Sequence, residues 1–294
     1  MESDVIIRGI TSDNIKITAA SSKNTVERAR VIHGLTPVTA AALGRTLIAA
    51  SMLGNALKNP GNSVTVQIHG DGPIGKIVAV SDNEGNVRGY CRRPAIELPL
   101  NSKNKLDVAG AVGSSGYLSV IKDIGLKEPY IGQVPLVSGE IAEDITAYLA
   151  KSEQIPSVCA LGVLVDRDLS IKHAGGYIIE LLPGASEDTI ERLENAIKDV
   201  PPVTQLLDDG MDIKQMMREV LRGFDIRFLD ETKVSYKCYC SKERVERMII
   251  SLGGKDLEEI IRDDKGAEIT CQFCDKVYRL TTDEIKKLAS GARS

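Results

Sequence analysis

The pattern of apolar and polar residues divides the chain into three parts. Up to residue 182, apolar and polar residues alternate in short runs between turn clusters, as is typical of half-buried strands. In residues 183–230 the apolar residues recur every three or four positions, which indicates helices. We therefore predict an α+β fold with an N-terminal core domain over 1–182, a helical linker region over 183–230, and a small C-terminal domain over 231–294.

The first part is expected to contain antiparallel sheets. Two alternating runs separated by a Thr-Ser-Asp-Asn cluster predict a hairpin, and three further runs joined by glycine-containing turns predict a meander. The expected strands cover 5–10, 14–19, 64–69, 76–80, 87–91, 110–120, 130–136, 159–165 and 173–182.

A long alanine-rich helix is predicted to form the centre of this domain. Thr36-Pro37 is a suitable cap and first-turn proline, and the helix should end near Asn59. Small residues occur on all its faces, so sheets can approach it from several sides. Although the stretch is apolar, Arg45 lies in its middle and much of it is alanine, which favours a buried helix over a membrane span.

Two more helices are expected in the first part. Asn24 or Thr25 is predicted to cap a short helix that runs through Val31. A second helix should cover 138–154, with its acidic residues (Glu140, Glu143 and Asp144) on a solvated face near the helix N-terminus.

The helical region carries a methionine-rich stripe. Its first helix should start at Ser186, and its second should run from Met211 to Arg222. Methionine suits promiscuous binding surfaces and also fills ordinary cores, so both interpretations stay open. The candidate client or linker surface consists of Met211, Ile213, Met216, Met217, Val220 and Leu221.

Four of the six cysteines cluster near the C-terminus, as Cys238-Tyr-Cys240 and Cys271-Gln-Phe-Cys274. Two such pairs folded together form the closed four-sulfur site that zinc prefers. Iron–sulfur clusters also use four thiolates, but their usual closely spaced cysteine runs are absent. The spacing therefore predicts one structural zinc ion. The isolated Cys91 and Cys159 are expected to be buried small hydrophobes.

The zinc domain is predicted to have a thin core. Its expected elements are a strand-like run at 233–237, a helix capped by Ser241, a short helix over 257–261 and a capping box at Thr281–Glu284. The segments 267–270 and 277–280 lead into and out of the turn that carries Cys271 and Cys274. With so few residues, a zinc site worth on the order of 10 kcal/mol should supply much of the folding free energy.

Charge and composition argue against several partners. The net charge is −4, and residues 231–294 carry thirteen basic against twelve acidic residues, so no basic footprint for phosphate is present. Aromatic residues make up 4%, with no tryptophan for base stacking. Nucleic-acid binding is disfavoured. The N-terminus does not have the pattern of a secretory signal, so we expect a cytoplasmic protein with reduced thiols and no membrane partner.

The whole sequence resembles the redox-regulated 33 kDa heat shock protein family of bacterial holdase chaperones. The residues that carry the resemblance are His33-Gly-Leu-Thr-Pro, Ala41-Ala-Leu-Gly-Arg45, Val87-Arg-Gly-Tyr90, the run Gly116–Gly125, Gly139–Asp144, Ser152–Pro156 and the paired cysteine motifs.

This resemblance implies a function without catalysis. Reduced, zinc-bound protein would be inactive, and oxidation would form Cys238–Cys240 and Cys271–Cys274 disulfides with release of zinc. The middle region would then loosen, the protein would dimerise, and unfolded clients would be held without ATP under oxidative and heat stress. A merely structural zinc unit, a thiol–disulfide oxidoreductase and a zinc-ribbon nucleic-acid module are the alternatives.

Overall fold

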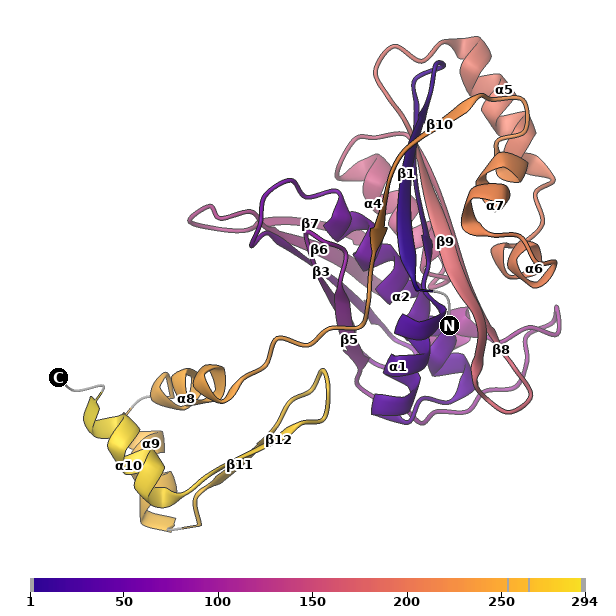
Figure 1. Cartoon of the computed structure of the whole chain (residues 1–294). Coiled ribbons are helices and arrows are strands. Elements are labelled where there is room, and N and C mark those ends of the chain that lie inside the picture. The colour runs from indigo at the N-terminus through magenta and orange to yellow at the C-terminus, as the bar shows by residue number, and fades with distance from the viewer. Residues whose placement is uncertain (1–2, 253, 264, 292–294) are drawn as a thin grey trace. The chain divides into compact units, whose positions relative to one another are not determined.

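The computed structural model describes residues 3–252, 254–263 and 265–291 (Figure 1). The chain forms two compact units, Met1–Lys237 and Cys238–Ser294. The first unit contains two five-stranded antiparallel sheets, and the second contains a two-stranded sheet with helices. The predicted α+β class is confirmed, whereas the three-part division at 182/183 and 230/231 stays a prediction.

Sheet A has the order β10-β1-β2-β9-β8 and sheet B the order β5-β4-β3-β6-β7. The strands of sheet A are β10 (Ile226–Lys233), β1 (Val5–Thr11), β2 (Ile15–Ser21), β9 (Ile171–Leu181) and β8 (Ser157–Val165). Those of sheet B are β5 (Val87–Cys91), β4 (Ile77–Asp82), β3 (Ser63–Gly70), β6 (Gly116–Asp123) and β7 (Tyr130–Pro135). The predicted hairpin and meander are both confirmed.

One strand prediction was wrong in part, and one strand was missed. The first residues of the range 110–120 belong to a short helix, α3 (Val108–Val112), because Asp107 caps it by accepting the Gly110 N–H at 2.9 Å. Strand β10 was not predicted. It is a polar edge strand in which buried and exposed residues alternate only weakly. It pairs with β1, a partner more than two hundred residues away in sequence.

Helix α2 (Pro37–Asn55) packs against strands of both sheets and is buried on all sides, as predicted. Glycine permits this close packing: a Cβ at Gly44 would come within 2.7 Å of Val26 and 2.9 Å of Val163. Among the described residues, α2 is the one helix long and apolar enough to cross a membrane. Of its apolar window, 89% is buried inside the protein, which is the environment of a core helix.

Helix α1 (Lys23–His33) has a cap that sequence reasoning misplaced. Asn24 and Thr25 lie inside the helix, and their backbone N–H groups donate to the Asp4 carboxylate at 3.0 and 2.6 Å. Asp4 is 5% exposed, so a buried carboxylate from outside the helix satisfies its N-terminus. A cap so distant in sequence leaves no local signal.

Helix α4 (Ala142–Lys151) begins later than predicted, after a loop organised by Asp144. The Asp144 carboxylate is fully buried and accepts N–H groups from Val137 at 2.7 Å, Ser138 at 3.2 Å and Ile141 at 3.0 Å. The prediction of a solvated face was therefore wrong for Asp144, although it holds for the exposed Glu143.

Replacing Asp144 by alanine should destabilise the first unit by about 3–5 kcal/mol, because three buried N–H groups lose their acceptor. The matched control is Glu143→Ala, which removes an exposed carboxylate from the same turn and should change stability by less than about 0.5 kcal/mol. Urea unfolding of both variants measures the difference. Equal unfolding midpoints would show that the Asp144 hydrogen bonds contribute nothing net.

The middle helices cover one face of sheet A (Figure 1). They are α5 (Glu187–Lys198), α6 (Val203–Asp208) and α7 (Ile213–Val220), of which α6 was not predicted. Helix α5 begins next to Ser186, as expected, and Ser186 caps it by accepting the Thr189 N–H. The apolar cluster beneath these helices combines Ile7, Ile15, Ile17, Tyr177 and Ile179 of the sheet with Leu193, Leu206, Leu207, Met216, Met217, Val220 and Leu221 of the cover.

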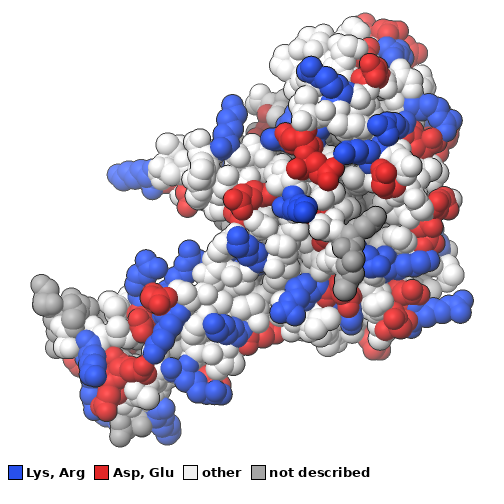
Figure 2. Space-filling model, in the orientation of Figure 1, with Lys and Arg blue, Asp and Glu red and all other residues white. Residues whose placement is uncertain are grey.

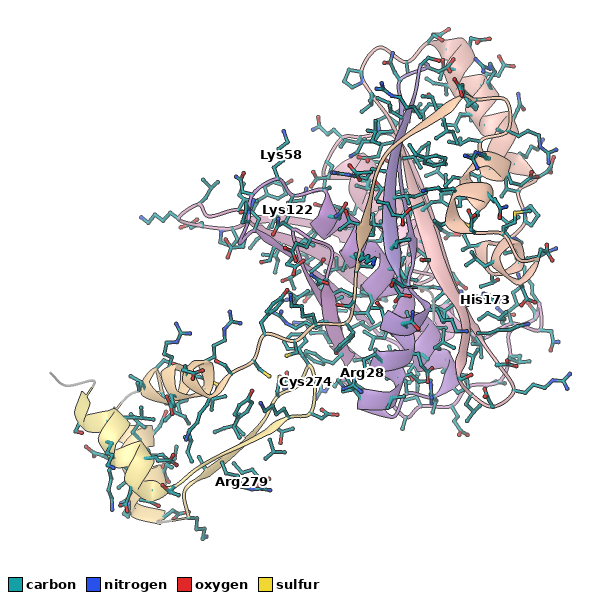
Figure 3. All side chains as sticks on the ribbon, viewed as in Figure 1. Arg28, Lys58, Lys122, His173, Cys274 and Arg279 are labelled. Carbon is teal, nitrogen blue, oxygen red and sulfur yellow. The ribbon has the colours of Figure 1, made fainter. Side chains whose placement is uncertain are left out.

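Polar contacts also join this cover to sheet A and its turns: Lys214 of α7 lies 2.8 Å from Glu231 of β10, and Arg192 of α5 lies 3.0 Å from Asp13. Asp208 at the end of α6 accepts a hydrogen bond from Lys172 at 2.5 Å and lies 3.1 Å from His173 Nε2. Both partners lie at the start of β9, where Figure 3 labels His173. The side chains of Asp208, Lys172 and His173 are 30–43% exposed, so these ion pairs contribute little stability. The middle helices are therefore held to sheet A mainly by their apolar side chains.

Candidate metal centre

The second unit is built from short elements around a small apolar cluster. Its elements are α8 (Lys242–Ile250), α9 (Gly254–Asp263), β11 (Ala267–Thr270), β12 (Val277–Leu280) and α10 (Thr282–Gly291). The predicted caps are confirmed: Ser241 accepts the Arg244 N–H, and Thr281 and Glu284 exchange the two bonds of a capping box. The buried apolar residues are Val245, Ile249, Leu257, Tyr278, Leu280 and Ile285.

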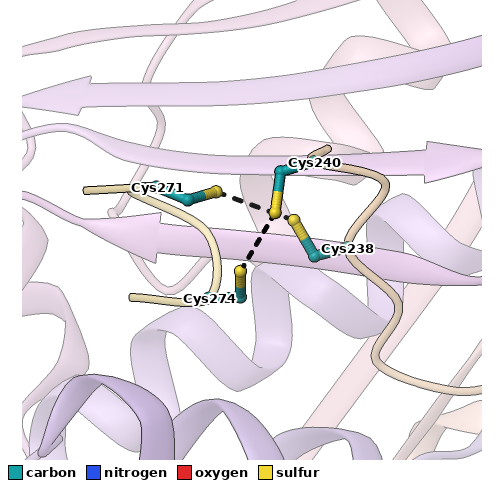
Figure 4. A group of neighbouring side chains, drawn as sticks. All are labelled: Cys238, Cys240, Cys271 and Cys274. Carbon is teal, nitrogen blue, oxygen red and sulfur yellow. Dashed lines mark hydrogen bonds between the residues drawn. The ribbon is translucent and has the colours of Figure 1, made fainter. Parts of the chain in front are cut away.

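The turn between β11 and β12 carries Cys271 and Cys274. The Cys271 carbonyl accepts the N–H groups of Cys274 at 3.3 Å and Asp275 at 2.9 Å, and the Cys271 N–H donates to Lys276 at 3.0 Å. Asp275 adopts a left-handed φ of 56°, which aspartate tolerates better than most residues. This tight turn directs both sulfurs to the same side, where the sulfurs of Cys238 and Cys240 meet them (Figure 4).

The sulfur separations match those of a metal-ligand set. Cys238 Sγ lies 3.7 Å from Cys271 Sγ, Cys240 Sγ lies 3.4 Å from Cys274 Sγ, and all four sulfurs lie within 4.8 Å of one another. Four sulfurs placed tetrahedrally at about 2.3 Å from zinc are separated by about 3.8 Å, whereas a disulfide bond is about 2 Å long. The four thiols are free and so arranged that one tetrahedral ion fits between them.

The four thiols are not electrostatically equivalent. Burial opposes ionisation of Cys240, but hydrogen bonds from the Tyr278 hydroxyl and the neighbouring thiols outweigh it and lower the pKa of Cys240 to about 7. Burial raises the pKa of Cys238, and burial together with the other thiols raises the pKa of Cys274 well above its ordinary value. Four thiolates at these distances repel one another, and a bound cation would offset that repulsion.

Tyr278 is the site residue that sequence reasoning missed. Its hydroxyl donates to Cys240 Sγ at 3.1 Å, and its ring is 7% exposed within the apolar cluster of the unit. The alternation of Val277-Tyr-Arg-Leu280 marks Tyr278 as inward-facing, which is the signal that could have pointed to it. Hydrogen bonds of this kind orient metal ligands and tune their basicity.

The methionine stripe lies elsewhere, in α7 and its flanks. Met216, Met217, Val220 and Leu221 are fully buried against sheet A, Ile213 is 6% exposed, and Met211 is half-buried. In this structure the candidate client surface is thus the inner face of a helical cover. Cys91 and Cys159 are buried, as predicted, and burial raises the pKa of Cys91 to about 12.

On the face drawn in Figure 2, the charged side chains of the described residues form no continuous basic stripe that would follow a nucleic-acid backbone. There, lysine and arginine alternate with aspartate and glutamate. Several of them pair directly, such as Lys242 with Glu284 and Arg279 with Glu268 in the second unit. The surface on this face gives no support to the nucleic-acid alternative.

Known proteins match this chain along almost its whole length. The family model described as "Hsp33 protein" matches residues 4–281. The chain is 48% identical to a 33 kDa chaperonin of Agathobacter rectalis, over 97% of this chain and 99% of that one. It is 45% identical to a 33 kDa chaperonin of Clostridium beijerinckii, over 99% of both chains.

A solved structure shares the fold. The 33 kDa chaperonin of Thermotoga maritima, a heat shock protein 33 homologue, superimposes with a TM-score of 0.90 at 35% identity, over 99% of both chains. The resemblance of the sequence to 33 kDa heat shock proteins is thereby confirmed. The family model, the relatives and the solved structure each match almost the whole chain. The chain therefore belongs to the Hsp33 family of chaperones.

Proposed function

We propose that this chaperone is an ATP-independent holdase that oxidation switches on. The observation that carries the proposal is the meeting of four free cysteine sulfurs within 4.8 Å of one another in a unit whose core is small. Such a site can exist in two chemical states, four metal-bound thiolates or two disulfides, and only the first gathers all four sulfurs around one point.

Zinc is the proposed ion of the reduced state. The donor set consists of sulfur alone, and a closed four-sulfur site is typical of structural zinc. Cys238, Cys240, Cys271 and Cys274 would be its ligands. The ion would supply folding free energy on the order of 10 kcal/mol, which the small apolar cluster of this unit needs.

The proposed switching reaction is a four-electron oxidation. Each disulfide forms as two thiolates lose two electrons, and with hydrogen peroxide as oxidant, two peroxide molecules and four protons yield four waters and a free zinc ion. We propose that the pairs are Cys238 with Cys240 and Cys271 with Cys274. The distances between Cys238 and Cys271 and between Cys240 and Cys274 make pairing across the motifs the alternative.

The proposed consequence is release of the helical cover. Oxidation removes the ion and unfolds residues 238–294, which follow directly on strand β10 and the segment after it. Helices α6 and α7 then leave sheet A, and the apolar residues on both faces become available to unfolded clients. Two opened copies would associate as a dimer. This activity requires no catalysis and belongs to the reducing cytoplasm, where thiols stay metal-bound until oxidant appears.

The test is a peroxide titration of the full-length, zinc-loaded protein. Zinc release, thiol content and suppression of client aggregation are measured on the same samples, and peptide mapping identifies the disulfides. We expect zinc to leave as four thiols disappear, with light scattering by the client falling in step. Equal protection by reduced, zinc-bound protein would refute the switch, and turnover in a disulfide-reduction assay would favour an oxidoreductase.

A further inference from the structure

The residues just before the cysteine cluster lie along an edge of sheet B. We call residues 234–237, with the sequence Val-Ser-Tyr-Lys, the strap. The strap follows β10 and pairs in parallel with β5, the edge strand of sheet B, through a bridge between Tyr236 and Val87 (Figure 1). The segment from β10 through the strap therefore forms one edge of sheet A and then pairs along one edge of sheet B.

The strap uses main-chain hydrogen bonds of the kind that any extended peptide can make. The Val87 N–H donates to the Ser235 carbonyl at 3.0 Å, and the Lys237 N–H donates to the Val87 carbonyl at 3.0 Å. The side chains of Ser235 and Lys237 are exposed, so side-chain packing contributes little at these two positions. Backbone pairing of this type binds extended polypeptides with little regard to their sequence.

The side chain of Tyr236 occupies the next hydrogen-bonding position along the β5 edge, at Gly89. Its hydroxyl donates to the Gly89 carbonyl at 2.9 Å and accepts the Gly89 N–H at 3.3 Å. His33 Nε2 lies 2.9 Å from the same carbonyl and 3.2 Å from the hydroxyl. Both backbone groups of Gly89 are thus satisfied by side chains, where a longer bound strand would supply main-chain groups.

Side chains also attach the strap to the first unit, and the Ser235 hydroxyl donates to Asn86 Oδ1 at 3.1 Å. Val234 is 7% exposed and packs on the core of the first unit, and its N–H donates to the Asp4 carbonyl at 3.0 Å. Tyr236 is half-buried, whereas Ser235 and Lys237 are exposed. Because Cys238 follows Lys237 directly, loss of structure in residues 238–294 frees one end of the strap.

We propose that the β5 edge is a binding strand for extended segments of unfolded polypeptides, and that the strap occupies it as a tethered ligand in the resting protein. The proposal rests on the holdase function proposed above and names one surface and one mode by which clients bind. An exposed sheet edge is a template for pairing with another chain, and covering it prevents that pairing. When the strap leaves, the exposed β5 edge can pair with an extended segment of a client.

The test uses the full-length protein and a fluorescent peptide with the strap sequence, Glu-Thr-Lys-Val-Ser-Tyr-Lys (residues 231–237). Its affinity is measured by fluorescence anisotropy for the reduced, zinc-loaded protein, for the oxidised protein, and for a reduced variant with a weakened strap, Val234→Ser with Tyr236→Ala. We expect the weakened strap and oxidation each to raise affinity about tenfold or more, because the tethered competitor is lost.

Two methylated peptides report how the peptide pairs. Neighbouring N–H groups of a strand point to opposite sides, so the N–H of Lys237 faces β5 and that of Tyr236 faces away. N-methylation at Lys237 should therefore weaken binding about tenfold or more, and N-methylation at Tyr236 should leave it nearly unchanged. A permanently unfolded carboxymethylated protein should displace the unmodified peptide.

The outcomes separate this inference from the holdase proposal. If neither the weakened-strap variant nor the oxidised protein binds the peptide, or if both methylated peptides bind equally, the β5 edge is not the binding strand. If the variant dimerises in light scattering and ignores the peptide, the edge pairs with a second copy instead. Each of these results overturns the inference while the aggregation assay of the oxidised protein independently decides the holdase function.

Discussion

Replacing Cys271 by serine is expected to abolish zinc binding and to unfold residues 238–294. Serine removes one of the four sulfurs that lie within 4.8 Å, and its neutral hydroxyl does not replace a thiolate ligand. The loss is on the order of 10 kcal/mol, more than the small apolar cluster of this unit can supply. Zinc content and hydrogen exchange of the two units measure the effect.

The control for this substitution is Cys91→Ser. Cys91 is a buried thiol of β5, in the first unit and outside the cluster, so its replacement costs some stability but should leave one zinc per chain. In the Cys271 variant the amides of sheets A and B should keep their protection. If residues 238–294 of that variant stay protected without zinc, the unit folds on its apolar core alone and a metal-dependent switch is excluded.

Replacing Met216 and Met217 together by alanine is expected to open the helical cover in the reduced, zinc-bound protein. Each methionine is fully buried against sheet A, and truncation of such a side chain costs about 2–5 kcal/mol. The two are adjacent, so their effects need not add. Since the exposed polar contacts of Asp208 and Lys214 add little, α6 and α7 should lose protection against hydrogen exchange.

The functional consequence follows from the proposed holdase activity. Opening the cover exposes Ile7, Ile17 and Tyr177 of sheet A without any oxidation, so the variant should suppress client aggregation while it retains zinc. Met248→Ala is the matched control, because this methionine is 45% exposed on α8 and its truncation should change neither property. If exchange shows the cover open and aggregation is unchanged, clients bind elsewhere.

Local patterns predicted most elements correctly. The cap at Ser241, the capping box at Thr281–Glu284 and the proline at the start of α2 depend on residues within a few positions of each other. The same is true of the strand alternation in the hairpin and the meander. These patterns can be recognised in the sequence because the interacting groups are close along the chain.

Elements whose partners are distant were the ones missed. Asp4 caps a helix that begins after β2, and β10 is a strand only because β1 lies beside it. Asp144 looks like an ordinary acidic residue of a helix N-terminus, yet three N–H groups of the preceding loop surround it. Nothing in the neighbouring residues distinguishes such a buried carboxylate from a solvated one.

The sequence alone determined the α+β class, the central buried helix and the four cysteines of the candidate metal site, because apolar periodicity and cysteine spacing are local properties. Only the tertiary structure decided that Met216 and Met217 face inward, that Tyr278 contacts Cys240, and that residues 234–237 lie along β5. Burial and edge pairing depend on which distant segments meet. The packing of the whole chain determines which segments meet, and no single stretch of the sequence specifies it.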